Sequence, residues 1–429
     1  MTKAKTASTS TSRVDKKVLS WALYDFGNSA FSTTIMAGFF PIFFKMFWSN
    51  GTDAVISTAR LGTTISIASV IVAMLSPTLG VVADLKGVKK TFCMAFAVIG
   101  ALACTWMYFI PMGDWFTALL AYGIAMMAFN AGTVFYESLL PFITTNRNLD
   151  YASSYGYAMG YLGGGVLFLL NVLMHLFPAA FGIKDGTVAI QISFVTVGVW
   201  WILFSLPLAK NVPEPEVPRN TDNAYRLTVR SLHTLRNTLK DLVVEKNTLL
   251  FIIAYWLYID GVYTVMAMAV DFGMAIGLES KDLIVALLIT QFIGAPFAYY
   301  FGTVTHKWGA RKPILFCIFI YSITVVLATL MTQAWHFFLL ALVIGMVQGG
   351  VQSLSRSMFA RMTPPKLSGE YFGLFNLVGR FASILGPVLV GMGALMTGSS
   401  RLGMLGIIIL FLAGGILLWN VREPEQESV

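Results

Sequence analysis

The sequence predicts an all-α membrane protein with twelve transmembrane helices, and three observations support this prediction. Hydrophobic residues make up 57% of the 429 residues and charged residues only 12%, whereas soluble proteins carry about twice that charged fraction. Apolar runs of the length that crosses a bilayer, about 20 residues, recur along the chain. One loop motif occurs twice at a fixed offset, which indicates two pseudo-symmetric bundles of six helices each.

Twelve apolar runs are long enough to cross the hydrocarbon core of a membrane. Glycine and proline interrupt them, but charged residues almost never do, and the alternating pattern of a β-barrel is absent from the sequence. The predicted spans are residues 18–47, 57–83, 91–111, 115–140, 152–177, 188–208, 248–272, 282–303, 313–332, 335–358, 370–395 and 402–421.

The lysine and arginine residues predict the orientation. If both termini face the cytoplasm, 22 of the 29 basic residues lie on that side, 5 lie outside and 2 lie within the membrane. This bias favours cytoplasmic tails at 1–17 and 422–429, bundles at 18–208 and 248–421, and a cytoplasmic linker at 209–247. Because the basic residues follow topology rather than forming a patch, no nucleic-acid partner is expected.

Within the linker, leucines lie on one face of a predicted helix and basic residues on another. This pattern suits an amphipathic helix on the inner membrane surface, and a solvated linker helix is the alternative. The leucines are Leu232, Leu235, Leu239 and Leu242.

The clearest sign of internal symmetry is the loop motif after the second and eighth spans. Gly80 and Gly87 correspond to Gly302 and Gly309 at an offset of 222 residues, and a basic pair closes each motif. This spacing predicts a tight turn in which glycines permit the bend and basic residues stay at the inner leaflet. The predicted gating-loop residues are Gly80, Asp84, Gly87, Lys89, Lys90, Gly302, His306, Gly309, Arg311 and Lys312.

The doubled loop resembles that of the major facilitator superfamily. The first span, Trp21-Ala-Leu-Tyr-Asp25-Phe-Gly-Asn28-Ser-Ala-Phe31, is similar to that of the subfamily related to the autophagy-linked vacuolar amino-acid effluxers of fungi. Similar stretches are 135–141, 257–262, 290–292 and 348–387. The resemblance implies the major facilitator fold, and it implies that Asp84 makes a gating contact with a neighbouring helix end.

Two positions of the loop motif depart from the superfamily pattern. His306 stands where an acidic residue is usual, and Leu85 stands where a basic residue is usual. An ordinary loop histidine is expected at 306, with a pH-sensitive gate as the alternative, because histidine titrates near neutral pH.

Five ionisable residues lie inside predicted spans. A charge at the bilayer centre costs about 2.5–3.5 kcal/mol, so each of these residues needs an explanation. Spans 1, 4, 7 and 10 carry polar faces, whereas spans 3, 6, 9 and 12 carry no charge in their cores. This division predicts an aqueous cavity lined by the first set, with the second set facing lipid. The ionisable residues are Asp25, Glu137, Asp260, Arg356 and Arg380.

These residues suggest roles in coupling and binding. We expect Asp260 or Asp25 to exchange a proton, because shielding from water favours the neutral carboxyl. Arg380 is expected to hold a substrate carboxylate or to neutralise Asp260, and Glu137 and Arg356 are expected to pair near the inner mouth. A static structural pair is the alternative for each. The expected substrate-binding residues are Asn28, Asn130, Tyr263, Gln291, Gln348 and Gln352.

The sequence therefore predicts a secondary active transporter for a small polar solute such as an amino acid. It is expected to be a monomer in contact with membrane lipids, in a bacterial cytoplasmic (inner) membrane. No cofactor or metal is expected; protons are the expected coupling ion, and Na⁺ is the alternative. The sequence shows no phosphate-binding loop or nucleophile motif, so no enzyme is expected.

Two other functions remain open at this stage. One is transport of an amphiphile, such as a lipid, a peptide or a siderophore-like molecule, and the other is a receptor that transports nothing. An amphiphile would need a wide apolar cavity, which a run of phenylalanines in the first span could line, although packing against lipid is their default placement. They are Phe39, Phe40, Phe43 and Phe44.

Overall fold

The computed structural model describes residues 15–217, 234–238, 240, 242, 244–275, 279–331, 333–382, 385–397 and 400–424. Within these ranges the side chains of some residues, among them His306 and Arg380, are not described. Most of the two predicted tails and much of the predicted linker helix lie outside the described residues.

The amino-terminal half contains six spans. The first starts as α1 (Lys16–Ala30) and continues through the wider turns of η1 (Phe31–Phe39), α2 (Phe40–Phe43) and η2 (Phe44–Trp48). The other five spans are α3 (Ala54–Lys86), α4 (Lys89–Met107), α5 (Trp115–Ser138), α7 (Leu149–Leu176) and α8 (Gly186–Asn211). Short turns at α6 (Leu140–Ile143), η3 (Asn146–Asn148) and η4 (Pro178–Phe181) connect them.

The carboxy-terminal half repeats this order. Its first four spans are α10 (Lys246–Ala275), α11 (Ser280–Trp308), α12 (Arg311–Thr329) and α13 (Ala334–Met362), and η5 (Pro365–Leu367) follows them. The fifth is built from α14 (Ser368–Phe381) and α15 (Leu385–Thr397), and the sixth from α16 (Ser400–Gly403), η6 (Met404–Gly406) and α17 (Ile407–Asn420).

The all-α, twelve-span prediction is confirmed. Among the described residues, ten helices are long and apolar enough to cross a membrane, and the last two spans are assembled from shorter helices. The predicted continuous run 370–395 is in fact two helices, because α14 ends at Phe381 and α15 begins at Leu385. Pro387 lies in the first turn of α15, where a missing N–H costs a helix little.

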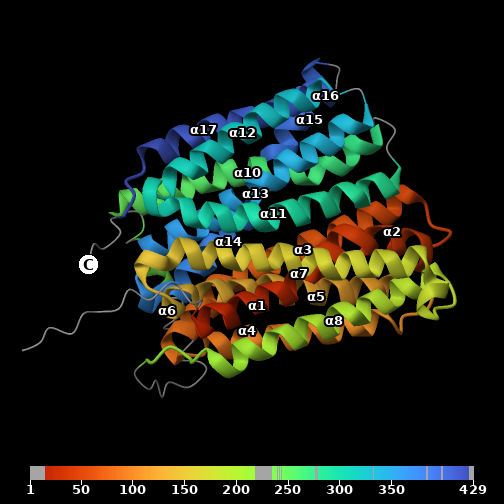
Figure 1. The fold of residues 1–429 in the computed structure, drawn as a ribbon, viewed down its shortest axis with the longest axis horizontal. Helices are drawn as coiled ribbons and strands as arrows, with labels where there is room; N and C mark the ends of the chain where they lie inside the picture. Colours follow the sequence, from red (N-terminus) through yellow and green to blue (C-terminus); the bar gives the residue numbers. More distant parts are fainter. Residues whose placement is uncertain are drawn as a thin grey trace, which may run out of the picture.

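The helices lie side by side along the long axis of the molecule (Figure 1). The amino-terminal half, red to yellow-green, occupies the lower part of the view, and the carboxy-terminal half, green to blue, occupies the upper part. Spans 3 and 6 (α4 and α8) form the lower edge, and spans 9 and 12 (α12 and α17) form the upper edge (Figure 1). These four are the spans that the sequence predicts to face lipid.

The two halves meet along α3 with α14 and along α7 with α11 and α13. Two corresponding glycines allow this contact. A Cβ at Gly80 would collide with the carbonyl of Gly369, and a Cβ at Gly302 would lie 2.5 Å from the Cβ of Ser154. We call these two contact regions the seam. Gly80 and Gly302 lie within helices and permit close approach, not the bend that we predicted for them.

The other two motif glycines make the predicted turns. Gly87 has a φ of +64° and Gly309 a φ of +70°, in the left-handed region that favours glycine. Each follows directly on the end of a helix, Gly87 after α3 and Gly309 after α11. The end of the bundle that carries these turns is the one predicted to face the cytoplasm, and we call it the inner end.

Candidate functional site

Arg356 of α13 is among the largest fully buried side chains of the described residues. Only 2% of its surface is exposed, and it crosses the seam to α7, where Nε donates to Ser153 Oγ at 2.9 Å and Nη2 donates to the Ser153 carbonyl at 2.7 Å. Its Nη1 lies 3.8 Å from Oε1 of Glu137 on α5. The structure thus brings Glu137 and Arg356 together, as the sequence predicted.

Aromatic rings enclose the guanidinium of Arg356. Its Cζ lies 4.9 Å from the ring centre of Trp21, 5.5 Å from that of Tyr136 and 4.3 Å from that of Tyr157. Cations are attracted to such ring faces most strongly when water is excluded. All three rings come from the amino-terminal half, so this half supplies a preformed box for a cation of the other half.

Asp25 lies beside this box on α1 and is half-buried. Its carboxylate accepts from Ser29 Oγ at 3.0 Å and from the Tyr136 hydroxyl at 3.3 Å, and it interacts electrostatically with Arg356. A Cβ at Gly160 of α7 would lie 3.1 Å from this carboxylate, so glycine is what lets α7 approach so closely. We call Asp25, Tyr136, Glu137, Tyr157 and Arg356 the central cluster.

Glu137 connects the central cluster with a second helix of the opposite half. Its Oε2 accepts from Asn376 Nδ2 of α14 at 2.7 Å. Only 5% of Glu137 is exposed, less than Asp25, so Asp25 is the more accessible carboxyl of the cluster. Sequence reasoning missed Asn376, because a lone asparagine in an apolar span gives no sign of its partner.

Asp260 lies on α10 and holds the start of α15. Its carboxylate accepts from the backbone N–H groups of Leu385 and Gly386 at 3.0 and 2.9 Å, and from Thr264 Oγ1 at 3.2 Å. A carboxylate in this position accepts from N–H groups of the first turn, which have no partner within the helix, and complements the helix dipole. Asp260 therefore has a structural role that the sequence did not indicate, and its proton-carrying role stays a prediction.

The predicted partner of Asp260 lies partly outside the described structure. Arg380 belongs to α14, but its side chain is not described, so neither its predicted pairing with Asp260 nor its contact with a substrate is placed.

Two predicted polar residues make contacts between the halves. Gln291 of α11 donates to Thr33 Oγ1 at 3.2 Å, and Gln352 of α13 accepts from the Tyr161 hydroxyl at 3.1 Å. Tyr263 of α10 is half-buried and interacts electrostatically with Tyr161 and also with Tyr157 of the central cluster. These residues extend the polar contacts between the halves beyond the central cluster.

The other predicted polar residues are deeply buried. Asn28 lies beside Tyr24 inside the amino-terminal half. Asn130 is fully buried, and within the described structure neither atom of its amide has a hydrogen-bond partner; the same holds for Oε1 of Gln348. Buried polar atoms of this kind usually bind ordered water.

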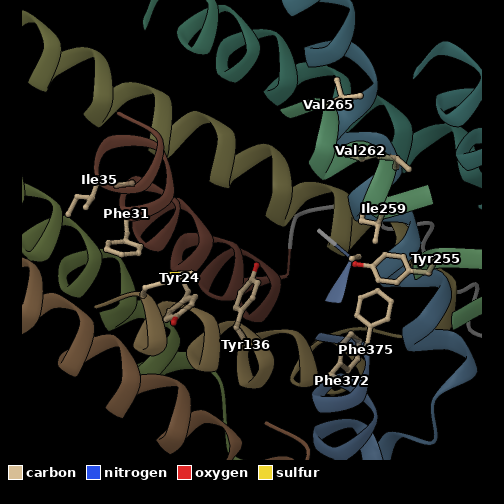
Figure 2. Close-up of a cluster of buried hydrophobic side chains, with 14 of the residues drawn as sticks. Tyr24, Phe31, Ile35, Tyr136, Tyr255, Ile259, Val262, Val265, Phe372 and Phe375 are labelled. Atoms are coloured by element: carbon tan, nitrogen blue, oxygen red, sulfur yellow. The ribbon is translucent and has the colours of Figure 1, made fainter. Parts of the chain in front are cut away.

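Tyrosines from both halves reach the region between them. In Figure 2, Tyr136 of the amino-terminal half and Tyr255 of the carboxy-terminal half both direct their hydroxyls toward the space between the two groups of labelled residues. Tyr255 also interacts electrostatically with Tyr157 and Glu137. The polar region between the halves is therefore rich in phenol groups.

The four phenylalanines of the first span are not where the sequence placed them. Phe39, Phe40, Phe43 and Phe44 are buried inside the amino-terminal half, so their default placement against lipid was wrong. Phe40 stacks on Tyr122 at 4.0 Å, and Phe43 packs edge-on against Trp48 at 4.8 Å. These rings form a core cluster, and they do not supply the wide apolar cavity that an amphiphile would need.

Tyr161 is a seam residue that the sequence did not point to. Its ring, from α7, lies between Gly294 of α11 and Gly349 of α13, and a Cβ at these glycines would lie 3.2 and 3.0 Å from the ring. The two glycines are the available signal, since small residues at helix contacts permit close approach.

Gly349→Ala is expected to destabilise the protein by about 1–3 kcal/mol, because the added methyl group overfills the Tyr161 slot. The added methyl group would also lie 2.6 Å from Cβ of Ala298. Gly391→Ala on α15 is the matched control, because a Cβ there meets nothing within 4 Å. Thermal unfolding in detergent tests this prediction, and equal unfolding temperatures for the two variants would contradict it.

The inner end of the seam is closed by Asp84 of α3. Its two carboxylate oxygens accept from the N–H groups of Gly369 and Glu370, in the first turn of α14, at 3.0 and 2.8 Å. Lys89 pairs with the same carboxylate and donates to Ser368 Oγ at 2.7 Å. The gating contact that the family resemblance implied for Asp84 is therefore present.

A second contact closes the other side of the inner end. Asp150, at the start of α7, pairs with Arg361 at 2.9 Å and accepts from the Ser357 hydroxyl, both on α13. Nearby, the hydroxyls of Ser154 and Ser353 lie 2.9 Å apart. Sequence reasoning missed Asp150 and Arg361, because they lie near predicted span ends, where charge needs no explanation. We call the Asp84 and Asp150 contacts together the inner gate.

We expected the basic residues of the two loops to lie at the membrane surface, but not all of them do. Lys89 is 1% exposed within the inner gate. Lys90 Nζ donates to the carbonyl of Val212 at 2.8 Å, and Arg311 Nη1 donates to that of Val421 at 2.9 Å, so both hold the end of the last helix of their half. Lys312 is exposed.

A second repeat, which sequence reasoning missed, completes these contacts. Asn211-Val-Pro-Glu214-Pro and Asn420-Val-Arg-Glu423-Pro follow the last span of each half. Glu214 accepts from the N–H of Thr91 at 2.7 Å, and Glu423 accepts from that of Arg311 at 3.3 Å. Each glutamate thus caps the third span of its half, which joins the third and sixth spans at the inner end.

Comparisons with known proteins agree with this architecture. The family model described as "Vacuole effluxer Atg22 like" matches residues 54–427. The "Uncharacterized MFS-type transporter YxiO" of Bacillus subtilis is 35% identical over 97% of each chain. "Autophagy-related protein 22-2" of Aspergillus oryzae is 28% identical over 65% of this chain, and the match spans about half (51%) of that longer relative.

Solved structures share the fold at low identity. The proton:xylose symporter XylE, a major facilitator superfamily protein, matches with a TM-score of 0.71 at 11% identity, over 96% of each chain. A bacterial homologue of the iron transporter ferroportin, in an outward-facing state, matches with a TM-score of 0.66 at 14% identity, over 95% of this chain and 99% of that one.

Proposed function

Since the chain belongs to the Atg22-like family of major facilitator transporters and is a multi-pass membrane protein, we propose that it is a proton-coupled secondary transporter. It moves a small polar solute, of which amino acids are the favoured class, by alternating access between two states of the seam. We place it, as a monomer, in the bacterial cytoplasmic membrane.

The central cluster is the observation that carries this proposal. A buried arginine and two carboxylates lie where the halves meet, with tyrosines around them. An amino acid carries one charge of each sign, so Arg356 suits its carboxylate and Asp25 suits its ammonium group. Intramembrane ionisable residues of this kind mark substrate or proton pathways in transporters.

Coupling follows from the position of Asp25. The ionised carboxylate attracts Arg356, whose bonds to Ser153 hold α13 against α7. Protonation of Asp25 removes one of the charges that hold the arginine, so the seam opens more easily. Because the inner gate is closed in this structure, solute and proton enter the site from the opposite end.

Protons are favoured over Na⁺ as the coupling ion by the partners of Asp25. Both side chains that contact its carboxylate are hydroxyl donors, Ser29 and Tyr136. Hydroxyls can donate to the ionised carboxylate and rotate to accept from the protonated form. A single carboxylate with two hydroxyls is a smaller set of oxygen ligands than hard cations prefer.

Amino-acid counterflow and gradient-driven uptake in proteoliposomes test the proposal. Asp25→Asn is expected to lower uptake driven by a pH gradient about tenfold or more, because the amide cannot carry a proton. Counterflow, which needs no net proton movement, should fall less, because the amide still offers an acceptor oxygen to the ammonium group. Glu216→Gln, an exposed carboxyl outside the seam, is the matched control and should behave as wild type.

The outcomes separate the parts of the proposal. If no amino acid shows counterflow, amino acids are not the substrate class. Uptake driven by a Na⁺ gradient but not by a pH gradient would replace the proton by Na⁺. Unchanged pH-driven uptake in Asp25→Asn would remove Asp25 from the coupling site.

A further inference from the structure

An apolar groove lies on the outside of the amino-terminal half, between α3, α4 and α5. Its volume is about 200 Å³. From α3 it is lined by Ile71, Val72, Leu75, Ser76 and Leu79, and the rest of its wall is built from apolar residues of α4 and α5. We propose that this groove binds the acyl chain of a membrane lipid, and that the bound chain supports the closed inner gate.

The groove offers nothing to a polar ligand. Ser76 is the only polar residue in its lining, and its hydroxyl already donates to the carbonyl of Val72 at 2.6 Å. Water needs two or more polar partners to stay in a cavity, so this one is dry or filled by hydrocarbon. The small polar solute of the central cluster therefore has no reason to bind here.

The mouth of the groove opens on the face of the bundle that meets lipid. Ile71, Leu75 and Ile99, at its rim, are 39%, 50% and 45% exposed. The α3 stretch from Ile71 to Leu79 is about 12 Å long at 1.5 Å per residue, which suits a segment of one extended acyl chain. In a multi-pass membrane protein, acyl chains are the apolar molecules that meet this surface.

Only the thickness of α3 separates the groove from the seam. On the seam side, Gly373 of α14 packs so closely that a Cβ there would lie 2.8 Å from Cα of Pro77 and from the Ser76 carbonyl oxygen. One turn further on, Gly80 packs against Gly369 of α14, and two turns further on, Asp84 makes its inner-gate contact with α14. An acyl chain behind Ser76 thus packs against the segment that the inner gate depends on.

Photocrosslinking in proteoliposomes tests the site. The probe is a phosphatidylethanolamine with a diazirine in the middle of one acyl chain, and mass spectrometry locates the labelled peptides. We expect label concentrated on 71–79, 96–99 and 124–131. Ala131→Leu fills the groove and should lower this label about fivefold, since the space becomes occupied.

Ala413→Leu, at a half-buried position of α17 outside the groove, is the matched control and should leave the label unchanged. Label spread evenly over lipid-facing helices, or label at the groove unaffected by Ala131→Leu, would overturn the proposal. Ala128→Val, a smaller change in the same wall, replaces Ala131→Leu if that variant does not fold.

The support of the gate has its own test, which needs no transport assay. Spin labels at Lys86→Cys and Lys366→Cys, both exposed on opposite halves at the inner end, report the opening of the inner gate by electron–electron distance measurement. Delipidation should lengthen this distance in the doubly labelled protein and in the same protein with Ala413→Leu. The distance should lengthen less with Ala131→Leu, because the leucine takes the place of the acyl chain. An equal response of all three proteins would refute this support.

Discussion

Arg356→Ala is expected to abolish solute uptake and to destabilise the protein by about 3–5 kcal/mol, because breaking a buried ion pair leaves carboxylates without compensation. The substitution removes both bonds to Ser153 and leaves Asp25 and Glu137 facing no cation at this position. Uptake in proteoliposomes and thermal unfolding in detergent measure the two effects.

Arg356→Lys is expected to rescue stability in part but not uptake. A lysine restores the charge, but it cannot direct separate donors to Ser153 Oγ, the Ser153 carbonyl and Glu137. Arg147→Ala, at an exposed loop position, is the control for loss of an arginine. If Arg356→Ala unfolds and transports as Arg147→Ala does, the central cluster is not the functional site.

Asp84→Asn is expected to open the inner gate. The neutral amide has one acceptor oxygen where the carboxylate has two, so at least one of the N–H groups of Gly369 and Glu370 loses its partner, and Lys89 loses its ion pair. Hydrogen bonds to charged groups contribute about 1.5–3 kcal/mol each, enough to reverse a two-state population. The Lys86–Lys366 spin-label distance should therefore lengthen.

Asp114→Asn is the matched control for this experiment. Asp114 caps α5 through the N–H of Thr117 at 3.1 Å, outside the seam, so its substitution makes the same carboxylate-to-amide change at a helix start without touching the gate. The native cysteines are all buried, which leaves the two introduced ones to react. An unchanged distance in Asp84→Asn would show that Asp84 does not hold the gate closed.

The fold could be predicted because its signals are local. Apolar length predicts each span, and the doubled loop predicts two halves. The contact of Glu137 with Arg356 was also predictable, because both residues come late in spans that run in the same direction, so counting residues places them at similar depth. Asp84 followed from the family resemblance of its loop.

The rest of the site depends on contacts that one sequence does not record. The hydropathy of 370–395 is continuous, so the end of α14 at Phe381 and the capping role of Asp260 could not be derived from it. Lys89 belongs to a segment with the composition of a surface loop, yet α14 covers its side chain. Asp150 and Arg361 are 211 residues apart and meet only once the halves are joined. The repeat around Glu214 and Glu423, by contrast, was present in the sequence and was overlooked.

Proton movement caused by the solute tests the central claim most directly. A pH-sensitive dye is sealed inside proteoliposomes with no initial gradient, and an amino acid that shows counterflow is added outside. If protons move through the cluster of Asp25 and Arg356, the solute should change the internal pH in wild type and in Glu216→Gln but not in Asp25→Asn. Solute uptake with no change of internal pH in wild type, or the same change in Asp25→Asn, would contradict this account.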